Sequence, residues 1–333
     1  MKAIIMNTDR SIEYKEMPSP SLKEGEVKIR VAACGICGTD MHVYKGMACS
    51  WALPGIIGHE FSGIISACAP GVAGYKEGDK VTVQPLVNCG ECTLCKDGKS
   101  NLCGHIRLIG GELPGGFAEE VAVPADALVR LPVDLPVEYG ALAEPAATAV
   151  HAVGRLGKKH YGQAMIFGAG AIGLLTLSVL RKMCDRIVVS DVDEARLQAA
   201  LSLGAESVIL ASKQDVAAEA LRAGDGKKYD LAVDAAGFSS TRRQGLAIIK
   251  PGGDLLYIAL GDKVTEVDFM QLVTGELTLY GTQCHTKADF YTALELMENG
   301  TIDYQKIVTR IPLSEAEEAF RNPYNGIKIH LIP

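Results

Sequence analysis

The sequence lacks any apolar run that approaches the roughly 20 residues of a membrane-spanning helix. Its first residues turn polar after Met6, so it also lacks the apolar core of a secretory signal peptide. Basic residues are not in excess, because 33 lysines and arginines face 40 aspartates and glutamates, for a net charge of −7. We therefore expect a soluble protein with neither a membrane nor a nucleic acid as its partner.

We also expect no disulfide bonds, although the chain contains ten cysteines. Four of them, at positions 89, 92, 95 and 103, lie close together. In a chain of 333 residues without a signal peptide, such spacing is typical of metal binding in a reducing compartment. We therefore expect a cytoplasmic protein. The length is sufficient for two domains, and 48% hydrophobic with 22% charged residues is typical of a globular chain.

The first part of the chain shows short strand patterns separated by turns. Val27, Ile29 and Val31 occupy alternate positions, which is the period of a half-buried strand. The predicted strands cover residues 1–6, 11–15, 27–31, 61–66, 80–83, 116–123 and 127–131. Together they predict a small all-β unit, a partly open barrel.

The pattern changes near residue 137. Residues 137–156 are rich in alanine and leucine and predict a helix that breaks or restarts at Pro145. Predicted strands at 164–167, 186–190, 207–209, 229–233, 254–258 and 277–281 then alternate with helical segments, among them 171–184 and 194–203. This alternation predicts a parallel sheet with helices on both faces. Helices at 287–298 and 314–321 and a strand at 327–331 complete the chain, and we expect this tail to return to the first part.

A dinucleotide-binding turn is predicted where the first strand of the parallel sheet ends. Gly168, Gly170 and Gly173 form a G-x-G-x-x-G between an apolar strand and a helix. Such glycines allow a tight turn and close approach of the backbone to a pyrophosphate at the helix N-terminus. Asp191 ends the next strand, where an acid is expected to bind the adenosine ribose. The predicted cofactor-binding residues are Gly168, Gly170, Ile172, Gly173, Asp191 and Arg196.

Asp191 also favours one cofactor over another. A carboxylate at this position binds a ribose diol but repels a 2′-phosphate, and the next two residues, Val192 and Asp193, supply no arginine to offset it. We therefore expect NAD and not NADP.

The four clustered cysteines predict a structural zinc site. Cys89, Cys92, Cys95 and Cys103 lie in a segment with several glycines, which suits a closed tetrahedral thiolate site. An iron–sulfur run shares the first spacings, but its fourth cysteine comes sooner and is followed by proline. Here Gly104 follows the fourth cysteine. A closed site of this kind holds a loop and performs no chemistry.

A second set of candidate ligands begins with Cys37, which lies between Gly35 and Gly38 in a turn-prone segment and is followed by Thr39 and His42. Cys37, His59 and a carboxylate would offer the N, S and O donors that suit a catalytic zinc. The carboxylate is either Glu60, beside His59, or Glu144, in an alanine-rich segment where a buried acid needs a partner. Both remain open.

Together these motifs resemble, in order and spacing, those of the zinc-dependent medium-chain alcohol dehydrogenases. The resemblance spans essentially the whole chain. It implies an α/β protein with a GroES-like β-rich catalytic domain at 1–148 and 284–333 and a Rossmann NAD-binding domain at 149–283. It also implies one catalytic and one structural zinc, and a homodimer or homotetramer formed through the edge of the Rossmann sheet.

Within that family the chain looks most like the polyol branch, which includes sorbitol, threonine, butanediol and galactitol-phosphate dehydrogenases. Glu144-Pro145 stands where other members carry a second cysteine ligand. Sorbitol dehydrogenases place a substrate-binding arginine after the last Rossmann strand, where this chain has Cys284-His285. His285 is therefore a candidate for substrate contact, with a surface histidine as the alternative.

The resemblance implies hydride transfer between NAD and a polyol, sugar or other secondary alcohol, giving the ketone. Zinc would lower the pKa of the substrate hydroxyl, and Thr39 would accept its proton and pass it through the nicotinamide ribose toward His42. The nicotinamide carries the redox chemistry. A threonine-type amino-alcohol dehydrogenase is the alternative, and a non-catalytic NAD-binding protein is a third, against which the retained Cys37, Thr39, His42 and His59 argue.

Overall fold

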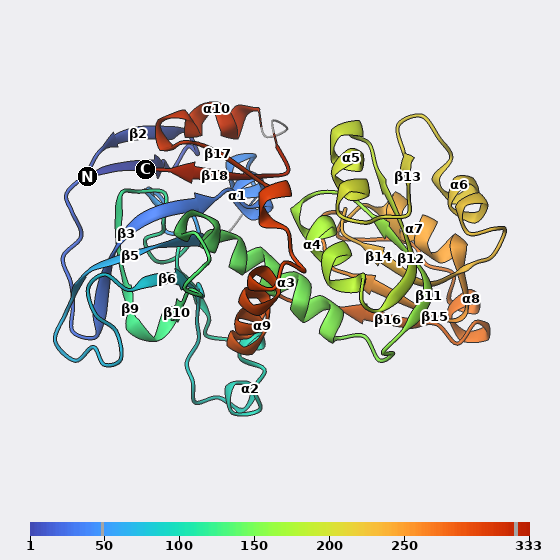
Figure 1. Ribbon diagram of the computed structural model, residues 1–333, viewed down its shortest axis with the longest axis horizontal. Helices are drawn as coiled ribbons and strands as arrows, with labels where there is room; N and C mark the ends of the chain where they lie inside the picture. The colour runs from blue at the N-terminus through green and yellow to red at the C-terminus, as the bar shows by residue number, and fades with distance from the viewer. Residues whose placement is uncertain (48–49, 323–325) are drawn as a thin grey trace. The chain divides into compact units, whose positions relative to one another are not determined.

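The computed structural model describes residues 1–47, 50–322 and 326–333, which form two compact units (Figure 1). The first contains both chain ends and consists of Met1–Glu144, Thr286–Asn299 and Val308–Pro333. The second consists of Pro145–His285 and Gly300–Ile307. Within the described ranges, none of the helices has the length and apolar character needed to cross a membrane.

The first unit is built mainly from strands. Its large sheet has the order β10-β6-β5-β3-β18-β17, and β9 pairs with β3 off this path. Its strands are β3 (Glu26–Gly35), β5 (Glu60–Cys68), β6 (Lys80–Val83), β9 (Glu120–Pro124), β10 (Leu128–Arg130), β17 (Val308–Pro312) and β18 (Lys328–Ile332). The predicted alternation is present in β3, where Val27, Ile29 and Val31 are buried. These side chains join an apolar core that includes Phe61 and Phe117.

Strand β3 places three chemically important segments side by side. At its end, Gly35 is in register with Glu60 of β5 on one side and with His330 of β18 on the other. Both pairings are antiparallel, so the end of β3 meets the start of β5. The segment after β3, which carries Cys37, therefore begins beside His59 and Glu60.

Smaller elements complete this unit. Two further sheets, with orders β2-β1-β4 and β7-β8, contain β1 (Lys2–Met6), β2 (Ile12–Glu16), β4 (Gly55–Ile56), β7 (Leu86–Val87) and β8 (Arg107–Leu108). The α-helices are α1 (Gly38–Tyr44), α2 (Thr93–Lys96), α9 (Lys287–Glu298) and α10 (Ala316–Arg321). The 3-10 helices are η1 (Ser100–Leu102), η2 (Ala125–Ala127), η3 (Val137–Leu142) and η5 (Leu313–Glu315).

The second unit is a six-stranded parallel sheet of order β13-β12-β11-β14-β15-β16. Its strands are β11 (Tyr161–Phe167), β12 (Cys184–Asp191), β13 (Ser207–Leu210), β14 (Tyr229–Asp234), β15 (Ile249–Tyr257) and β16 (Thr278–Gly281). Its helices are α3 (Ala143–Gly154, beginning at the end of the first unit), α4 (Ala171–Leu180), α5 (Glu194–Ser202), α6 (Val216–Ala223), α7 (Ser239–Ile248), α8 (Phe269–Thr274) and η4 (Tyr304–Lys306).

The arrangement of this unit is a doubly wound Rossmann sheet. Figure 1 shows α4 and α5 on one side of the strands and α6 and α8 on the other. Both faces of the inner strands are therefore covered, which explains why residues 164–167 of β11 are buried without alternation.

One helix prediction is confirmed and one helix boundary is wrong. The helical stretch expected to break or restart at Pro145 does so close to it: η3 ends at Leu142 and α3 begins at Ala143, with Pro145 in its first turn, where the missing N–H has no intrahelical partner to lose. The helix expected to reach Cys184 ends at Leu180, and Cys184 instead opens strand β12. Arg181, Lys182 and Met183 follow the helix end, and all three are residue types with good helix propensity, so the sequence alone did not mark the change.

Candidate metal and dinucleotide sites

The structure brings Cys37, His59 and Glu60 together, with one potential ligand atom of each within 4.8 Å of the others. Cys37 is the residue that caps the N-terminus of α1, and its Sγ accepts a hydrogen bond from Thr39 N at 3.5 Å. His59 directly precedes β5, and Glu60 is the first residue of that strand. A thiolate, an imidazole and a carboxylate form a donor set that suits zinc, so these residues fit the ion that the sequence predicts.

Asp40 orients the first two members of this set. Its carboxylate accepts a hydrogen bond from Cys37 N at 2.8 Å, and its Oδ1 lies 3.6 Å from His59 Nδ1. Asp40 is fully buried, and this burial raises the pKa of its carboxyl to about 6, against the lowering influence of His59. Burial lowers the pKa of His59, but the charges of Cys37 and Asp40 outweigh it and raise that pKa overall. A carboxylate behind a ligand imidazole is a common way to fix its ring and tautomer.

Glu60 has a buried partner that the sequence did not predict. Lys328 Nζ from β18 forms an ion pair with Glu60 Oε2 and also donates a hydrogen bond to Ile36 O at 2.9 Å. Both side chains are at most 4% exposed. Burial lowers the pKa of Lys328, but Glu60 and Cys37 outweigh it and raise the pKa above its usual 10.5, so the ammonium stays charged.

The other predicted residues of this site lie near it in different ways. Glu144, in the first turn of α3, is buried and acts on His59 and Lys328 through its charge, but it is not among the three grouped ligands. Thr39 and His42 both lie on α1 and are three residues apart, so they share one face of that helix. Thr39 is exposed and His42 half-buried.

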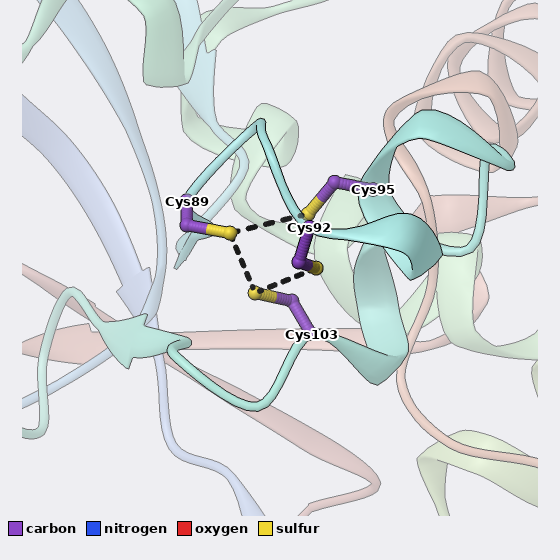
Figure 2. A group of neighbouring side chains, drawn as sticks. All are labelled: Cys89, Cys92, Cys95 and Cys103. Carbon is purple, nitrogen blue, oxygen red and sulfur yellow. Dashed lines mark hydrogen bonds between the residues drawn. The ribbon is translucent and has the colours of Figure 1, made fainter.

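The four cysteines of the predicted structural site also converge (Figure 2). Their sulfurs lie 3.5 Å apart for Cys89 and Cys103, and 3.9 Å apart both for Cys89 with Cys95 and for Cys92 with Cys103. Backbone N–H groups of Cys92 and Glu91 lower the pKa of Cys89 to about 6, which favours its thiolate. Four sulfurs at this spacing fit a tetrahedral zinc ion, whose bonds to sulfur are about 2.3 Å long.

The second unit contains the predicted dinucleotide turn. Gly168 has a φ of +99°, and Gly170 precedes the first residue of α4. A Cβ on Gly173 would lie 1.9 Å from the carbonyl oxygen of Gly168, so only glycine fits there. Asp191 reaches this turn, because its Oδ2 accepts a hydrogen bond from Ala169 N at 2.6 Å.

Two further predicted residues are placed less directly. Arg196 lies half-buried in the first turn of α5, where its backbone N–H donates to Asp193 Oδ1 at 3.1 Å. Ile172 lies half-buried in the first turn of α4. His285 is fully buried, so the alternative of a surface histidine is wrong.

The fold and the two sites together define a dinucleotide-dependent dehydrogenase with a metal centre. Residues 23–133 match the model of the alcohol dehydrogenase GroES-like domain, and residues 171–299 match that of the zinc-binding dehydrogenases. The chain belongs to the zinc-binding medium-chain alcohol dehydrogenase family, as the resemblance of its motifs implied. It is an enzyme that acts on alcohol groups.

Individual relatives cover nearly the whole chain. The 2-dehydro-3-deoxy-L-galactonate 5-dehydrogenase of Pseudoalteromonas atlantica is 34% identical over 94% of this chain and 92% of its own length. The L-threonine 3-dehydrogenase of Bacillus velezensis is also 34% identical, over 100% of this chain and 99% of its own. An alcohol dehydrogenase of Escherichia coli CFT073, solved with NADH, superposes with a TM-score of 0.91 at 28% identity, covering 100% of this chain and 99% of that one.

Lys328 and Asp40 are the site residues that sequence reasoning missed. Lys328 occupies a strand whose neighbours are mostly apolar, and a lysine on an apolar strand is a weak signal of a buried charge. Asp40 stands three residues after Cys37, the spacing of a helix capping box, and that signal was available in the sequence.

Proposed function

We propose that this enzyme oxidises a secondary alcohol of a polyol, sugar or sugar acid to the ketone with NAD, using a zinc ion held by Cys37, His59 and Glu60. The observation that carries this proposal is the convergence of those three donors next to helix α1. Glu60 is a better candidate for the third ligand than Glu144, because only Glu60 lies within 4.8 Å of the ligand atoms of Cys37 and His59.

The chain's own residues divide the work. Zinc bound there would act as a Lewis acid that lowers the pKa of the substrate hydroxyl. Thr39 accepts the hydroxyl proton, and His42, one turn further along α1, receives it on the way to solvent. Asp40 holds Cys37 and His59 in place, and Lys328 holds Glu60.

Support for NAD comes from Asp191 at the end of β12. Its two carboxylate oxygens accept hydrogen bonds from the backbone N–H groups of Ala169 and Asp193, which fixes the acid beside the glycine turn. A fixed negative charge there repels a 2′-phosphate. We expect kcat/KM for NAD to exceed that for NADP by at least about 100-fold, measured by absorbance at saturating alcohol. Equal values for the two cofactors would refute the preference.

The substrate class is tested with a panel followed by NADH formation: polyols, polyol phosphates, sugar acids and L-threonine. Turnover of a polyol or sugar acid supports the proposal. The second candidate is an amino-alcohol dehydrogenase, which the relative named L-threonine 3-dehydrogenase favours, and L-threonine as the best substrate would establish it.

A Cys37→Ala variant that still turned over normally would refute the metal site.

We also propose that two or four copies associate through the edge of the Rossmann sheet. Strand β16 is one of the two edge strands, and α8, which precedes it in the chain, exposes Phe269, Met270 and Val273, each at least 70% exposed. An exposed apolar group on an open sheet edge favours pairing with another copy.

The expected test is Val273→Asp, which should shift the mass measured by light scattering toward the monomer. Val133→Asp is the matched control, because Val133 is 85% exposed in the first unit. If Val273→Asp leaves the mass unchanged, this edge is not the interface.

Two remaining points are inferences of the same kind. We infer that the catalytic domain comprises 1–148 and 284–333 and the NAD-binding domain 149–283, which is supported by the first unit containing both chain ends. We also infer a cytoplasmic location, supported by four grouped cysteines that suit metal binding in a reducing compartment.

A further inference from the structure

The four-cysteine lobe is inserted between the two strands of one small ribbon. Strand β7 ends at Val87 and β8 begins at Arg107, with Leu86 paired to Leu108 and Val87 to Arg107. The chain then forms a tight turn, Leu108–Glu112, in which Gly111 N donates to Leu108 O at 3.1 Å and Leu113 N to the same oxygen at 3.0 Å. A metal ion that orders the lobe would therefore also fix the position of Leu108, the first residue of this turn.

The two glycines of this turn lie directly against the catalytic site. A Cβ on Gly110 would lie 2.4 Å from the carbonyl oxygen of Gly58 and 2.7 Å from His59 N. A Cβ on Gly111 would lie 2.9 Å from Nε1 of Trp51. The turn thus touches the backbone of one proposed zinc ligand and the indole of Trp51, with no space between them for a side chain.

Glu112 fastens the segment that carries Trp51 to the turn. One carboxylate oxygen accepts a hydrogen bond from Leu108 N at 2.8 Å, and the other accepts one from Ser50 Oγ. Ala52 N donates to Gly111 O at 3.1 Å, so Trp51 is held on both sides. Its ring meets the His59 imidazole edge to face, with centroids 6.3 Å apart.

We propose that the turn Leu108–Glu112 couples the four-cysteine lobe to Trp51 beside the metal ligand His59, where this ring would contact the alcohol, with Glu112 as the positioning residue and Trp51 as the part that moves. The proposal rests on the proposed function only where it takes His59 as a ligand of the catalytic zinc. It gives the lobe a role beyond holding its own loop, because loss of order in the lobe would release Trp51 from His59.

Trp51 is the only tryptophan in the chain, so its fluorescence reports on this contact alone. We expect Glu112→Ala to raise acrylamide quenching of Trp51 about twofold and KM for the alcohol about three- to tenfold, with kcat nearly unchanged. Glu112→Gln should restore both values, because its amide can accept from Leu108 N and donate to Ser50 Oγ. Glu120→Ala is the matched control, since Glu120 is also half-buried and accepts from a serine hydroxyl, that of Ser19.

A second variant tests the lobe itself. Cys95→Ser should lose one zinc by atomic emission and raise Trp51 quenching to the level of Glu112→Ala, at temperatures where far-UV circular dichroism is unchanged. Quenching that stays at the wild-type value in Glu112→Ala overturns the proposal. So does quenching in Glu112→Gln that equals that of Glu112→Ala.

The fluorescence readout separates this proposal from the proposed function. If the protein is an active dehydrogenase but Trp51 quenching stays at the wild-type value in both Glu112→Ala and Cys95→Ser, the coupling is refuted and the proposed function is not. A protein without alcohol turnover whose Trp51 responds as expected would refute the function and leave the coupling intact. If Cys95→Ser does not fold, the comparison of Glu112→Ala with Glu112→Gln still decides whether Glu112 positions Trp51, and Trp51 quenching in the wild-type enzyme before and after removal of zinc by a chelator decides whether the lobe does.

Discussion

Lys328 and Glu60 form the ion pair on which the charge balance of the catalytic site depends. Burying the ammonium of Lys328 or the carboxylate of Glu60 alone would cost free energy, because each would lose its hydration. The structure accommodates both charges because they are in contact with each other. The carboxylate also has a second oxygen, so Glu60 can hold Lys328 and still offer a donor to a metal. The burial of both side chains distinguishes this pair from the many exposed ion pairs of the chain.

Removing the Lys328 charge should cost stability. We expect Lys328→Met to lower the free energy of unfolding by about 3 kcal/mol, because Glu60 is left buried without its cation. The pKa of Lys328 is raised above its usual 10.5, so the ammonium is charged at neutral pH and the pair contributes fully to stability there. This contribution is lost only as the pH rises above 10.5 and through the raised pKa. The measurement is urea denaturation at pH 7.

Lys306→Met is the control for this experiment. Lys306 pairs with Asp303 at 3.2 Å, but both side chains are more than a third exposed, so the expected loss is below about 1 kcal/mol. Equal losses in the two variants would show that the burial of the Lys328–Glu60 pair carries no special weight.

In the turn from β11 into α4, Gly173 and Gly170 are glycines for different reasons. Gly173 is needed by the fold itself, because its missing Cβ leaves room for the carbonyl of Gly168. Gly170 is different: a Cβ there would meet nothing within 4 Å, and its φ of −71° suits any residue. Its glycine is therefore explained only by a ligand that approaches the helix N-terminus.

These differences predict two outcomes. Gly173→Ala should lower the melting temperature by several degrees and weaken NADH binding, because the Cβ displaces the turn. Gly170→Ala should keep the wild-type melting temperature and weaken NADH binding about tenfold or more, because its methyl lies where the backbone must approach the pyrophosphate. Thermal unfolding and NADH fluorescence titration measure the two properties. Unchanged NADH affinity in Gly170→Ala would contradict the placement of the cofactor.

Sequence patterns predicted this fold where local rules apply. The alternation in β3, the glycine turn and the spacing of the four cysteines each depend on neighbours within a few residues, and each led to the element or cluster that the structure contains. The partnership of Lys328 with Glu60 could not be predicted in this way, because it depends on β18 and β5 lying on either side of β3. Pro145 is a further case of a local rule that holds, because the helix restarts at Ala143 and Pro145 lies in its first turn.

For the whole molecule, the two clusters predict two zinc ions per chain with separable effects. Cys37→Ala should lose one zinc and all turnover while the melting temperature changes little, because the β-rich core does not depend on that ligand. Cys103→Ala should lose the other zinc and lower the melting temperature by several degrees, since a closed thiolate site contributes folding energy directly. Atomic emission with calorimetry measures both. A single zinc in the wild-type enzyme would contradict the assignment of one of the clusters.

Strand β18 has a consequence for biosynthesis. The large sheet of the first unit is complete only when residues 328–332 pair with β3 and β17, and these residues follow the entire parallel sheet in the chain. A ribosome therefore releases all strands of the nucleotide-binding unit before the β-rich unit can close. During that interval Glu60 has no lysine beside it, so the newly made catalytic site stays open to water until the last strand arrives.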